Sequence, residues 1–555
     1  MTTSITGGEL VVRTLEKAGV QRLFGLHGAH LETIFQSCRT HGIPVLDTRH
    51  EVAAGHAAEG YARATRKLGV AMITAGPGFT NVITSMANAF LDRTPVLYLS
   101  GAAALRDAET STLQAGIDQV AIAKPITKWA HQVTTVQQLP RLLAQAIRLA
   151  TSGPTGPVLL DLPSDVLGAQ VEEGSVTIPD PIPLAPVAPA QEAITRALHL
   201  LREARRPVIM AGVGAWQSAC ERELREFVES AGIPVFSDFQ AHGLLPSDHP
   251  LYGGTFHKMA DLTGAERPDV VLALGVRFGL FTLGSSDRLV PSAAQIIHVE
   301  IDPKEIGRLR GVALGVVADS REMLRALLAS KQPWPDHSLW SDRIRTLKRT
   351  RLEMQIRETA RSAPPIHPYQ AVATLVDSID SNTTVVADGA ETYHWLNEVI
   401  RQSRPGSYIT HGFLGAVGFG MGLALGAQTA DPGRRVLCVV GDGAFGFTMA
   451  ELDTMARHRL PIVVVIMNNR SWAASQHFQE IVSGAAQVTG TRLSDARYHD
   501  VATALGCHAQ HVTRIEELRP ALKAAFDSGR PACLNVEIDL APLPPELHLL
   551  MARHS

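Results

Sequence analysis

The sequence predicts an α/β protein made of three doubly wound domains, each built on a parallel sheet. Short apolar, β-branched runs alternate with amphipathic helical patterns along the chain. Proline-rich stretches interrupt this alternation at residues 176–191 and between Pro333 and Pro365. We therefore expect domains at residues 1–182, 192–335 and 366–555, which are of ordinary domain size.

Clear strand patterns occur in all three domains as short apolar runs bounded by glycine, proline or polar residues. They cover residues 22–26, 69–75, 95–100 and 157–162 in the first domain, 206–212, 232–237, 269–275 and 295–301 in the second, and 383–387, 436–440, 461–467 and 532–538 in the third. A further strand end is expected at Asp47. The similarity of residues 152–162 to 528–540 suggests a shared topology of the first and third domains, although chance explains it equally well.

Composition argues for an enzyme that acts on small molecules. The chain has 51 Lys and Arg against 54 Asp and Glu and no basic run, so we expect no nucleic-acid and no membrane partner. The five cysteines are scattered without metal-type spacing, as in a reduced protein. The first residues lack a signal-peptide pattern, and no apolar run reaches the roughly 20 residues of a membrane span. We expect a soluble, cytoplasmic protein.

A strand and its turn near residue 440 form the first candidate site. The apolar run 436–440 ends in Gly441, Asp442 and Gly443. Glycines let the backbone approach a ligand closely, and a following helix directs free N–H groups at an anion. The pattern is typical of a phosphate site, although an ordinary turn explains the triplet taken alone.

A second strand pattern brings two amides to the same edge of the sheet. Residues 461–467 are apolar and lead into Asn468 and Asn469. Because ligands of open α/β sheets bind beyond the carboxyl ends of the strands, we expect Asp442 and Asn469 to meet there. One carboxylate, one amide oxygen and spare carbonyl groups suit Mg²⁺, which commonly also binds substrate phosphates. The sequence therefore predicts a diphosphate held through Mg²⁺.

This segment resembles the thiamine diphosphate-dependent enzymes, whose pattern is Gly-Asp-Gly, one helix, one apolar strand and Asn-Asn. The resemblance implies thiamine diphosphate and Mg²⁺ as cofactors, with Asp442, Asn469 and the Ser471 carbonyl as metal ligands. It makes the first domain the pyrimidine-binding domain, the second the middle domain and the third the diphosphate- and metal-binding domain. The cofactor contacts that it implies are Glu51, Thr74, Asn81, Ala390, Gly415, Val417, Asp442, Gly443, Ala444, Asn469, Ser471, Trp472 and Ala473.

Glu51 begins an alanine-rich helical pattern directly after a strand end. Apolar neighbours there would desolvate the carboxyl group and raise its pKa, so that it could exchange a proton near neutral pH. An acid that complements the helix dipole is the simpler explanation of this stretch alone. Residues 51–62 resemble the family segment whose glutamate contacts the aminopyrimidine ring, which implies proton transfer by Glu51. The family divides this site between two subunits, so we expect a homodimer at least, and a homotetramer.

Two further segments concern the substrate. Residues 24–30 place His27 and His30 on a turn after the first strand, and histidine titrates near pH 6.5, as a proton shuttle requires. Gln114 can both donate and accept hydrogen bonds. A surface histidine pair and a solvated glutamine explain these segments without catalysis. Both segments, however, resemble the benzaldehyde lyase family, and that resemblance extends over residues 6–533.

The benzaldehyde lyase resemblance implies an aldehyde lyase and carboligase that cleaves and forms acyloins, the 2-hydroxy ketones made from two aldehydes, such as benzoin. It implies catalytic roles for Glu51, His30 and Gln114, with His30 as acid and base at the substrate hydroxyl. The expected ligands are small-molecule aldehydes and acyloins. The implied substrate pocket contains His27, Ala29, Phe90, Ser164, Tyr393, Ala474 and Phe478.

Several pocket positions differ from that family. Ser164 and Phe90 replace family tryptophans, Gln476 replaces a leucine and Val417 a methionine. We therefore expect a roomier and more polar pocket, looser support of the cofactor, and a substrate range that need not be aromatic. The glycine-rich residues 411–422 are expected to form a helix that approaches a neighbour closely.

Two other functions stay open. A 2-oxo acid decarboxylase or acetolactate synthase-like enzyme would share the cofactor site, although the chain lacks the adjacent histidines of most of the former and the Pro-Gly-Gly of the latter. A catalytically inactive binding protein would keep the fold and have lost catalysis, although the retained Glu51, Asp442, Asn469 and His30 speak against it. The middle domain lacks a tight glycine-rich turn after its third strand pattern, near Gly275, so we expect it to serve assembly, with a nucleotide site left open.

Overall fold

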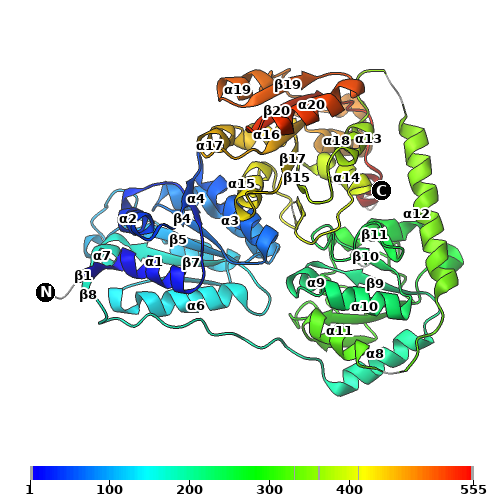
Figure 1. Ribbon diagram of the computed structural model, residues 1–555, viewed down its shortest axis with the longest axis horizontal. Helices are drawn as coiled ribbons and strands as arrows, with labels where there is room; N and C mark the ends of the chain where they lie inside the picture. The colour runs from blue at the N-terminus through cyan, green and yellow to red at the C-terminus, as the bar shows by residue number, and fades with distance from the viewer. Residues whose placement is uncertain (1–3, 285, 331, 361–362, 411, 552–555) are drawn as a thin grey trace.

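The computed structural model describes residues 4–284, 286–330, 332–360, 363–410 and 412–551. Figure 1 shows three lobes, coloured blue to cyan, green, and yellow to red along the chain, and helices flank the strands in each. Each lobe contains a six-stranded sheet whose neighbouring strands are parallel. The predicted fold class, α/β with three doubly wound parallel-sheet domains, is confirmed.

The sheet of the first domain has the order β3-β2-β4-β5-β7-β6. Its strands are β2 (Leu23–Gly25), β3 (Val45–Asp47), β4 (Gly69–Ile73), β5 (Val96–Ala102), β6 (Trp129–Gln132) and β7 (Val158–Pro163). Its main helices are α1 (Gly7–Lys17), α2 (Glu32–His41), α3 (Glu51–Thr65), α4 (Pro77–Leu91) and α6 (Leu139–Thr151). The four central strands are buried throughout, as apolar runs covered on both faces should be.

The third domain repeats this topology with the order β16-β15-β17-β18-β20-β19. Its strands are β15 (Thr384–Asp388), β16 (Tyr408–Thr410), β17 (Val436–Gly441), β18 (Val463–Asn468), β19 (His508–Val512) and β20 (Ala532–Glu537). Its main helices are α13 (Pro368–Asp377), α14 (Ala390–Val399), α15 (Gly420–Ala430), α16 (Asp442–Thr448), α17 (Glu451–Arg457), α18 (Ala473–Ser483), α20 (Ile515–Asp527) and α21 (Pro545–Met551). Counted along the chain, both sheets run second, first, third, fourth, sixth, fifth, so the suggested shared topology is confirmed.

The middle domain has a different order, β11-β10-β9-β12-β13-β14, which is that of dinucleotide-binding folds. Its strands are β9 (Pro207–Ala211), β10 (Val235–Ser237), β11 (Tyr252–Thr255), β12 (Val270–Leu274), β13 (Gln295–Glu300) and β14 (Leu314–Val317), and its main helices are α8 (Gln191–Glu203), α10 (Glu221–Ala231) and α11 (Ser320–Leu328). The expected absence of a glycine turn was wrong, because the glycines follow the first strand: a Cβ on Gly214 would lie 2.7 Å from the Gly275 Cα.

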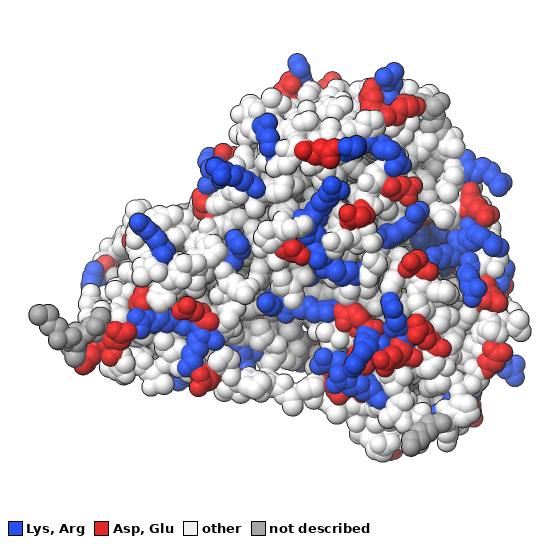
Figure 2. Space-filling model, in the orientation of Figure 1, with Lys and Arg blue, Asp and Glu red and all other residues white. Residues whose placement is uncertain are grey.

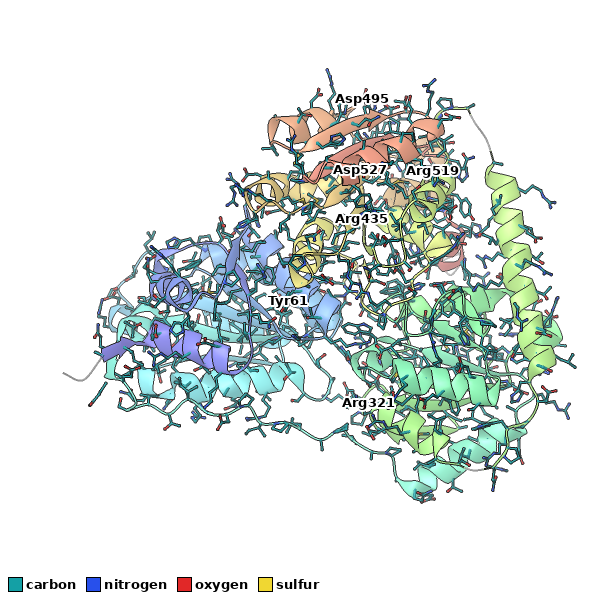
Figure 3. All side chains as sticks on the ribbon, in the orientation of Figure 1. Tyr61, Arg321, Arg435, Asp495, Arg519 and Asp527 are labelled. Atoms are coloured by element: carbon teal, nitrogen blue, oxygen red, sulfur yellow. The ribbon has the colours of Figure 1, made fainter. Side chains whose placement is uncertain are left out.

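The first and third domains pack through α3 and α15, which cross at the centre of the molecule (Figure 1). Glycines allow this close approach, since a Cβ on Gly426 would lie only 2.0 Å from the Ala57 carbonyl oxygen. Tyr61 lies on α3 at this junction (Figure 3). Because Glu51 is the first residue of α3, the same contact fixes the helix that carries it.

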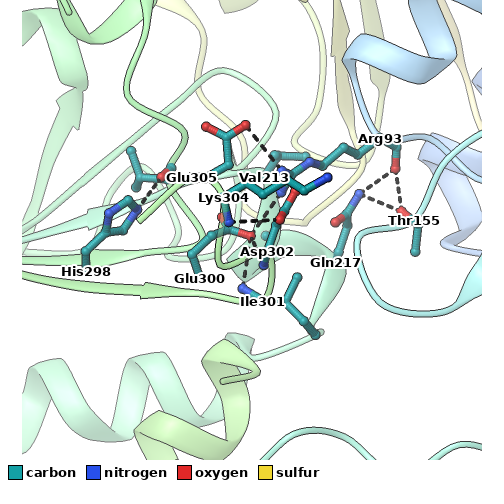
Figure 4. A network of polar contacts seen from close by, with 12 residues as sticks. Arg93, Thr155, Val213, Gln217, His298, Glu300, Ile301, Asp302, Lys304 and Glu305 are labelled. Carbon is teal, nitrogen blue, oxygen red and sulfur yellow. Dashed lines mark hydrogen bonds and ion pairs between the residues drawn. The ribbon is translucent and has the colours of Figure 1, made fainter. Parts of the chain in front are cut away.

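Arg93 joins the first domain to the middle domain (Figure 4). Its guanidinium lies 2.9 Å from Glu300 Oε1 at the end of β13 and 3.0 Å from Asp302 Oδ2. Gln217 donates its amide to the Arg93 carbonyl oxygen at 2.7 Å and to Thr155 at 2.9 Å. The carboxyl edge of the middle sheet therefore takes part in a contact between domains.

The helix expected over residues 411–422 begins only at Gly420. Gly415 and Gly418 have φ angles of +65° and +84°, which a right-handed helix does not allow. The buried Asp388 carboxylate accepts hydrogen bonds from the Gly418 and Gly420 amides and so fixes the loop. His411 lies outside the described residues.

Charges of both signs are mixed over the face shown in Figure 2, where Lys and Arg lie beside Asp and Glu. Such mixing gives no extended field of one sign on that face. Within the described ranges, no helix is both long enough and apolar enough to cross a membrane.

Candidate active site

Glu51 lies at the carboxyl edge of the first sheet, just after β3, and its residue is 9% exposed. Asn81, in the first turns of α4, donates its side-chain amide to Glu51 Oε2 at 2.9 Å. A Cβ on Gly78 would lie 3.5 Å from Glu51 Oε1, so the turn into α4 passes directly beside the carboxylate. The structure thus brings together Glu51 and Asn81, two of the residues expected at the pyrimidine ring.

His30 lies at the same edge, on the short 3₁₀ turn Ala29–Leu31 that contains the predicted pocket residue Ala29. Its Nδ1 is 3.1 Å from the hydroxyl of Thr74, another predicted cofactor contact. The ring is half-buried, and this burial lowers the pKa of His30 below its usual value. A neutral imidazole at neutral pH can accept a proton.

His27, only three residues earlier, does not join this group. Its ring is exposed, lies 2.6 Å from the carboxylate of Glu32 and packs on Phe35. The structure therefore places His27 in a surface ion pair, which is the non-catalytic explanation of that histidine.

Gln114 lies on the loop between β5 and β6 with a φ angle of +60°, an unusual conformation for a residue with a side chain. Its Cα and Cβ lie so close to Gly76 that a Cβ there would be about 3.0 Å from them. Behind it, the buried Gln119 accepts the Gly76 amide at 2.9 Å and donates to Gly101 at 3.0 Å and Asp161 at 2.5 Å. Gln119 thus fixes the strand ends next to both Gln114 and His30, since Gly101 contacts the His30 side chain.

A cavity of about 320 Å³ opens beside Gln114 at this edge of the sheet. Gln119, Gln132 and the buried Asp161 form its polar wall at the ends of β5, β6 and β7. Its lining includes three carboxylates, Asp107, Glu109 and Asp161, and no Lys, Arg or His. Burial raises the pKa of Asp161 to about 6.

Asp442 begins α16 at the carboxyl edge of the third sheet and is 2% exposed. Its Oδ2 is buried and has no hydrogen-bond partner among the described residues. Burial raises the pKa of Asp442 to about 6. An unpartnered buried carboxylate oxygen is what a cation site needs before its cation binds, because the ion supplies the missing charge.

The loop after β18 provides the remaining predicted metal ligands. Ser471 donates its backbone amide to Asn469 Oδ1 at 3.1 Å, which holds these residues together beside Asp442. Among the described residues no cluster of three His, Cys, Asp or Glu side chains could hold a metal. The predicted set has one carboxylate, one amide and one backbone carbonyl, so such a cluster is not required. These donors fit Mg²⁺ with a diphosphate.

Close backbone approach marks the predicted diphosphate cradle. A Cβ on Gly443 would lie 2.7 Å from the Trp472 ring, so only glycine fits there. Ala444 and Ala473 are buried beside it, and Ala390 follows Gly389 at the start of α14. Gly415 is open on its Cβ side, and Val417 packs on the core that contains Ala444. Of these positions, Gly415 is the one whose open Cβ side would let a ligand approach the backbone.

The predicted pocket wall is only partly assembled in one chain. Tyr393 is fully buried, and its ring packs edge-on against Phe239 at 5.3 Å. Phe478, four residues after Ala474 on α18, is 43% exposed. Ser164 begins a helical turn directly after β7, whereas Phe90 lies in the last turn of α4, about 13 Å along the helix from Asn81.

Three buried ion pairs near these residues were not predicted. His477 Nδ1 lies 2.6 Å from Glu391 on α14, and Glu391 raises the pKa of His477 against the effect of burial. Glu546 in the C-terminal helix α21 lies between His257 of the middle domain at 2.6 Å and His394 at 3.2 Å. No local spacing joins such distant positions, so no pattern in the sequence predicts these pairs.

Comparison with known proteins identifies the same three domains. The N-terminal TPP binding domain of thiamine pyrophosphate enzymes matches residues 5–122, their central domain residues 194–327 and their C-terminal TPP binding domain residues 388–536. Thiamine pyrophosphate is another name for thiamine diphosphate. The matched parts contain Glu51, His30 and Asp442.

Curated relatives match along almost the whole chain. An acetolactate synthase large subunit of Mycobacterium tuberculosis is 35% identical over 96% of this chain and 95% of its own length. A probable acetolactate synthase large subunit of Methanocaldococcus jannaschii is 32% identical over 96% and 92%, and the oxalyl-CoA decarboxylase of Escherichia coli is 32% identical over 96% and 95%. These names correspond to the alternative function weighed above and do not include a benzaldehyde lyase. Matched by all three domain models and by these relatives, the chain belongs to the thiamine pyrophosphate-dependent enzymes.

Proposed function

We propose that this protein is a thiamine diphosphate- and Mg²⁺-dependent lyase and carboligase that cleaves and forms acyloins from aldehydes. The observation that carries the proposal is the group at the edge of the first sheet: a half-buried His30 with a lowered pKa, linked to Glu51 through Thr74 and Gly78 and to Gln114 through Gln119. An acyloin hydroxyl needs a base to lose its proton, and a neutral imidazole can take it.

His30 performs the proton transfer at Nε2, because Nδ1 is directed to the Thr74 hydroxyl. Removal of the hydroxyl proton is coupled to cleavage of the adjacent C–C bond, which releases one aldehyde. Bound thiamine diphosphate would accept the electron pair of that bond. His30 then gives this proton to the carbon that becomes the C–H carbon of the second aldehyde, which can then leave, and the same steps in reverse are a carboligation. Gln114 binds the carbonyl or hydroxyl oxygen through its neutral amide.

Glu51 and Asp442 would bind different parts of the cofactor. Glu51 lies where a protonated ring nitrogen would bind, and Asn81 fixes its orientation. Asp442, Asn469 and the Ser471 carbonyl would hold Mg²⁺ and, through it, the diphosphate. Gly415, which is open on its Cβ side, would leave room for it to approach the backbone, and Gly443 lets the Trp472 ring pack beside Asp442.

The lining of the cavity beside Gln114 favours neutral substrates. It contains three carboxylates and no cationic side chain, so a 2-oxo acid would meet charges of its own sign there. Aldehydes and acyloins carry no charge and pay no such cost. This electrostatic argument supports the acyloin lyase over an enzyme that would bind a carboxylate substrate in this cavity.

The second candidate is a 2-oxo acid decarboxylase or acetolactate synthase-like enzyme. It is favoured by the relatives, of which two are named acetolactate synthases and one an oxalyl-CoA decarboxylase. The sequence identity of 32–35% leaves room for a change of substrate within one cofactor chemistry.

We also propose that two copies complete the site. Large apolar side chains beside the metal loop are exposed in the single chain, including Phe447 at 63%, Val482 at 59%, Ile481 at 49% and Phe478 at 43%. Several exposed large apolar side chains in one region suit a subunit interface. We expect at least a homodimer, and a homotetramer as the full assembly. Size-exclusion chromatography coupled to light scattering measures this state.

A product assay decides between the two candidates. The purified enzyme with thiamine diphosphate and Mg²⁺ is given benzoin, acetoin, single aldehydes, pyruvate and benzoylformate, and products are followed by chromatography and CO₂ release. Acyloin cleavage and ligation without CO₂ would support the lyase. Release of CO₂ from the 2-oxo acids without acyloin cleavage would replace it with the second candidate, and full cofactor binding with no turnover would indicate a binding protein.

A further inference from the structure

The cavity beside Gln114 has more hydrogen-bonding capacity than its own side chains use. The Asp161 carboxylate accepts from Gln119 at 2.5 Å and from Gln132 at 2.8 Å. An ionised carboxylate offers about four lone-pair sites, so Asp161 can accept further donors from a molecule in the cavity. Ser111 and Gln114 line the same space and add polar groups to it.

Asp161 is also a charge without a counter-ion. It is 3% exposed, and no Lys, Arg or His lies within 4.0 Å of its carboxylate among the described residues. A buried carboxylate gains most from hydrogen bonds that stabilise its ionised form. Hydroxyl groups supply such bonds at no cost in charge desolvation. Ammonium groups would supply them too, but amines condense with the aldehydes on which the enzyme is proposed to act.

The position of the cavity links it to the reacting groups. Gln119 donates to Asp161 and accepts the Gly76 amide, and Gly76 packs on Gln114. Gln114 itself lines the cavity, so a substrate whose oxygen is bound by Gln114 can extend directly toward Asp161 and Gln132. A volume of about 320 Å³ is within the lower range of small-molecule pockets and accommodates a short chain rather than a large ring system.

We propose that this cavity is a specificity subsite that binds the hydroxyl groups of short hydroxyaldehydes and their acyloins, with Asp161 and Gln132 as the recognising residues. The inference rests on the proposed function, because it names the substrate class of that site. It predicts that a hydroxylated aldehyde is preferred to an alkyl aldehyde of similar length.

The test compares two acceptor aldehydes with one fixed donor. The kcat/KM for glyceraldehyde and for butanal is measured with the wild-type holoenzyme and with the variants Asp161→Asn and Gln132→Leu. Asp180→Asn, at an exposed ion pair outside the lining of the cavity, is the matched control. We expect the ratio of glyceraldehyde to butanal to fall about tenfold in Asp161→Asn, the size of one hydrogen bond to a charged group, and severalfold in Gln132→Leu. The control should keep the wild-type ratio.

A purely structural role of Asp161 would lower both values equally, and that result, or an unchanged ratio in both variants, would overturn the proposal. Gln132→Leu keeps the test decisive if Asp161→Asn does not fold. Ligand-detected NMR with erythritol and 1-butanol reports on the subsite without turnover. Saturable erythritol binding that Asp161→Asn and Gln132→Leu weaken would support the subsite even if no aldehyde is ligated, whereas erythritol binding that neither variant changes would refute it.

Discussion

The carboxyl edges of the first and third sheets can be compared strand by strand, because the two sheets have the same order. In the first domain the turns after the strands carry Glu51, His30 and Gln114, which are groups that exchange protons or donate and accept hydrogen bonds. In the third domain the equivalent edge carries Asp442 and Asn469, which are oxygen donors next to glycines.

This difference teaches that the topology fixes where a ligand binds and the turns decide what is done to it. His30 is half-buried and has a lowered pKa, so it can change its protonation state. Asp442 is 2% exposed with an unpartnered oxygen, so it is arranged to receive a cation. Variants at the two edges should therefore fail in different ways.

The largest effect is expected for Glu51→Gln. The glutamine side chain has the same size and can still accept the Asn81 hydrogen bond, but it cannot exchange a proton. We therefore expect kcat to fall about 10³-fold, while the affinity for thiamine diphosphate, measured by calorimetry, changes little. Glu32→Gln, on the neighbouring exposed pair with His27, is the matched control and should stay active. Equal activity of Glu51→Gln and wild type would remove Glu51 from the mechanism.

At the carboxyl edge of the third sheet, Asp442→Asn should weaken cofactor binding, while the catalytic step of the cofactor-bound enzyme is retained. Removing a metal ligand is expected to weaken Mg²⁺-dependent binding of thiamine diphosphate about 100-fold or more, with partial rescue of activity at high Mg²⁺. Asp431→Asn, in a partly exposed pair with Arg434, serves as the control. Undiminished cofactor affinity in Asp442→Asn would break the assignment of the two edges.

Whether a strand could be predicted from the sequence depends on its position in the sheet. The clear strand patterns correspond to the four central strands of every sheet, which are apolar because both faces are covered. In the six-stranded sheets, the strands that lacked a pattern, β6, β11, β14, β16 and β19, are sheet edges, and β3, anticipated only by its end at Asp47, is one too. The separate two-stranded sheet of Ser4–Thr6 and Gln170–Glu172 also lacked a pattern. Most of these edge strands are partly exposed, so their composition resembles that of loops, whereas β16 is buried but only three residues long.

The candidate site shows the same limit. Glu51, His30 and Asp442 were found because each follows a strand, and parallel strands end at one edge. Their neighbours Asn81 and Thr74 came from the family resemblance and lie beside them. The Glu391–His477 pair and the burial of Tyr393 depend on contacts between distant helices, which no local pattern encodes.

The variant His30→Ala tests, through the pH dependence of activity, whether the edge of the first sheet exchanges protons. We expect kcat for acyloin cleavage to fall about 100-fold. In the wild type, activity requires neutral His30, so it should decline as pH falls through a pKa below the ordinary 6.5, and this acid limb should vanish in the variant. His27→Ala, on the same turn but in a surface pair, should keep both rate and limb. Loss of activity in Glu51→Gln but not in His30→Ala would remove the proposed proton role of His30.

The smallest effect has the opposite sign and concerns stability. The pKa of Asp442 is raised from 3.8 to about 6 in the folded chain, so the folded state retains a proton that the unfolded state loses between these pH values. Stability must then decrease as pH rises from about 4 to about 6, and the full cost persists above that range. Without metal at pH 7–8, Asp442→Asn should therefore be more stable than wild type by about 1–3 kcal/mol.

Thermal unfolding of the metal-free proteins at pH 7.5 and pH 4 measures this difference, which should shrink at the lower pH. Adding Mg²⁺ and thiamine diphosphate should reverse the ranking, because only the wild type gains the binding free energy of the cofactor. A metal-free wild type that is more stable than Asp442→Asn at pH 7.5 would mean that the carboxylate is already stabilised by the protein. The turn at the carboxyl edge of the third domain's sheet would then have a structural role only. Its contrast with the proton-exchanging edge of the first domain would be lost.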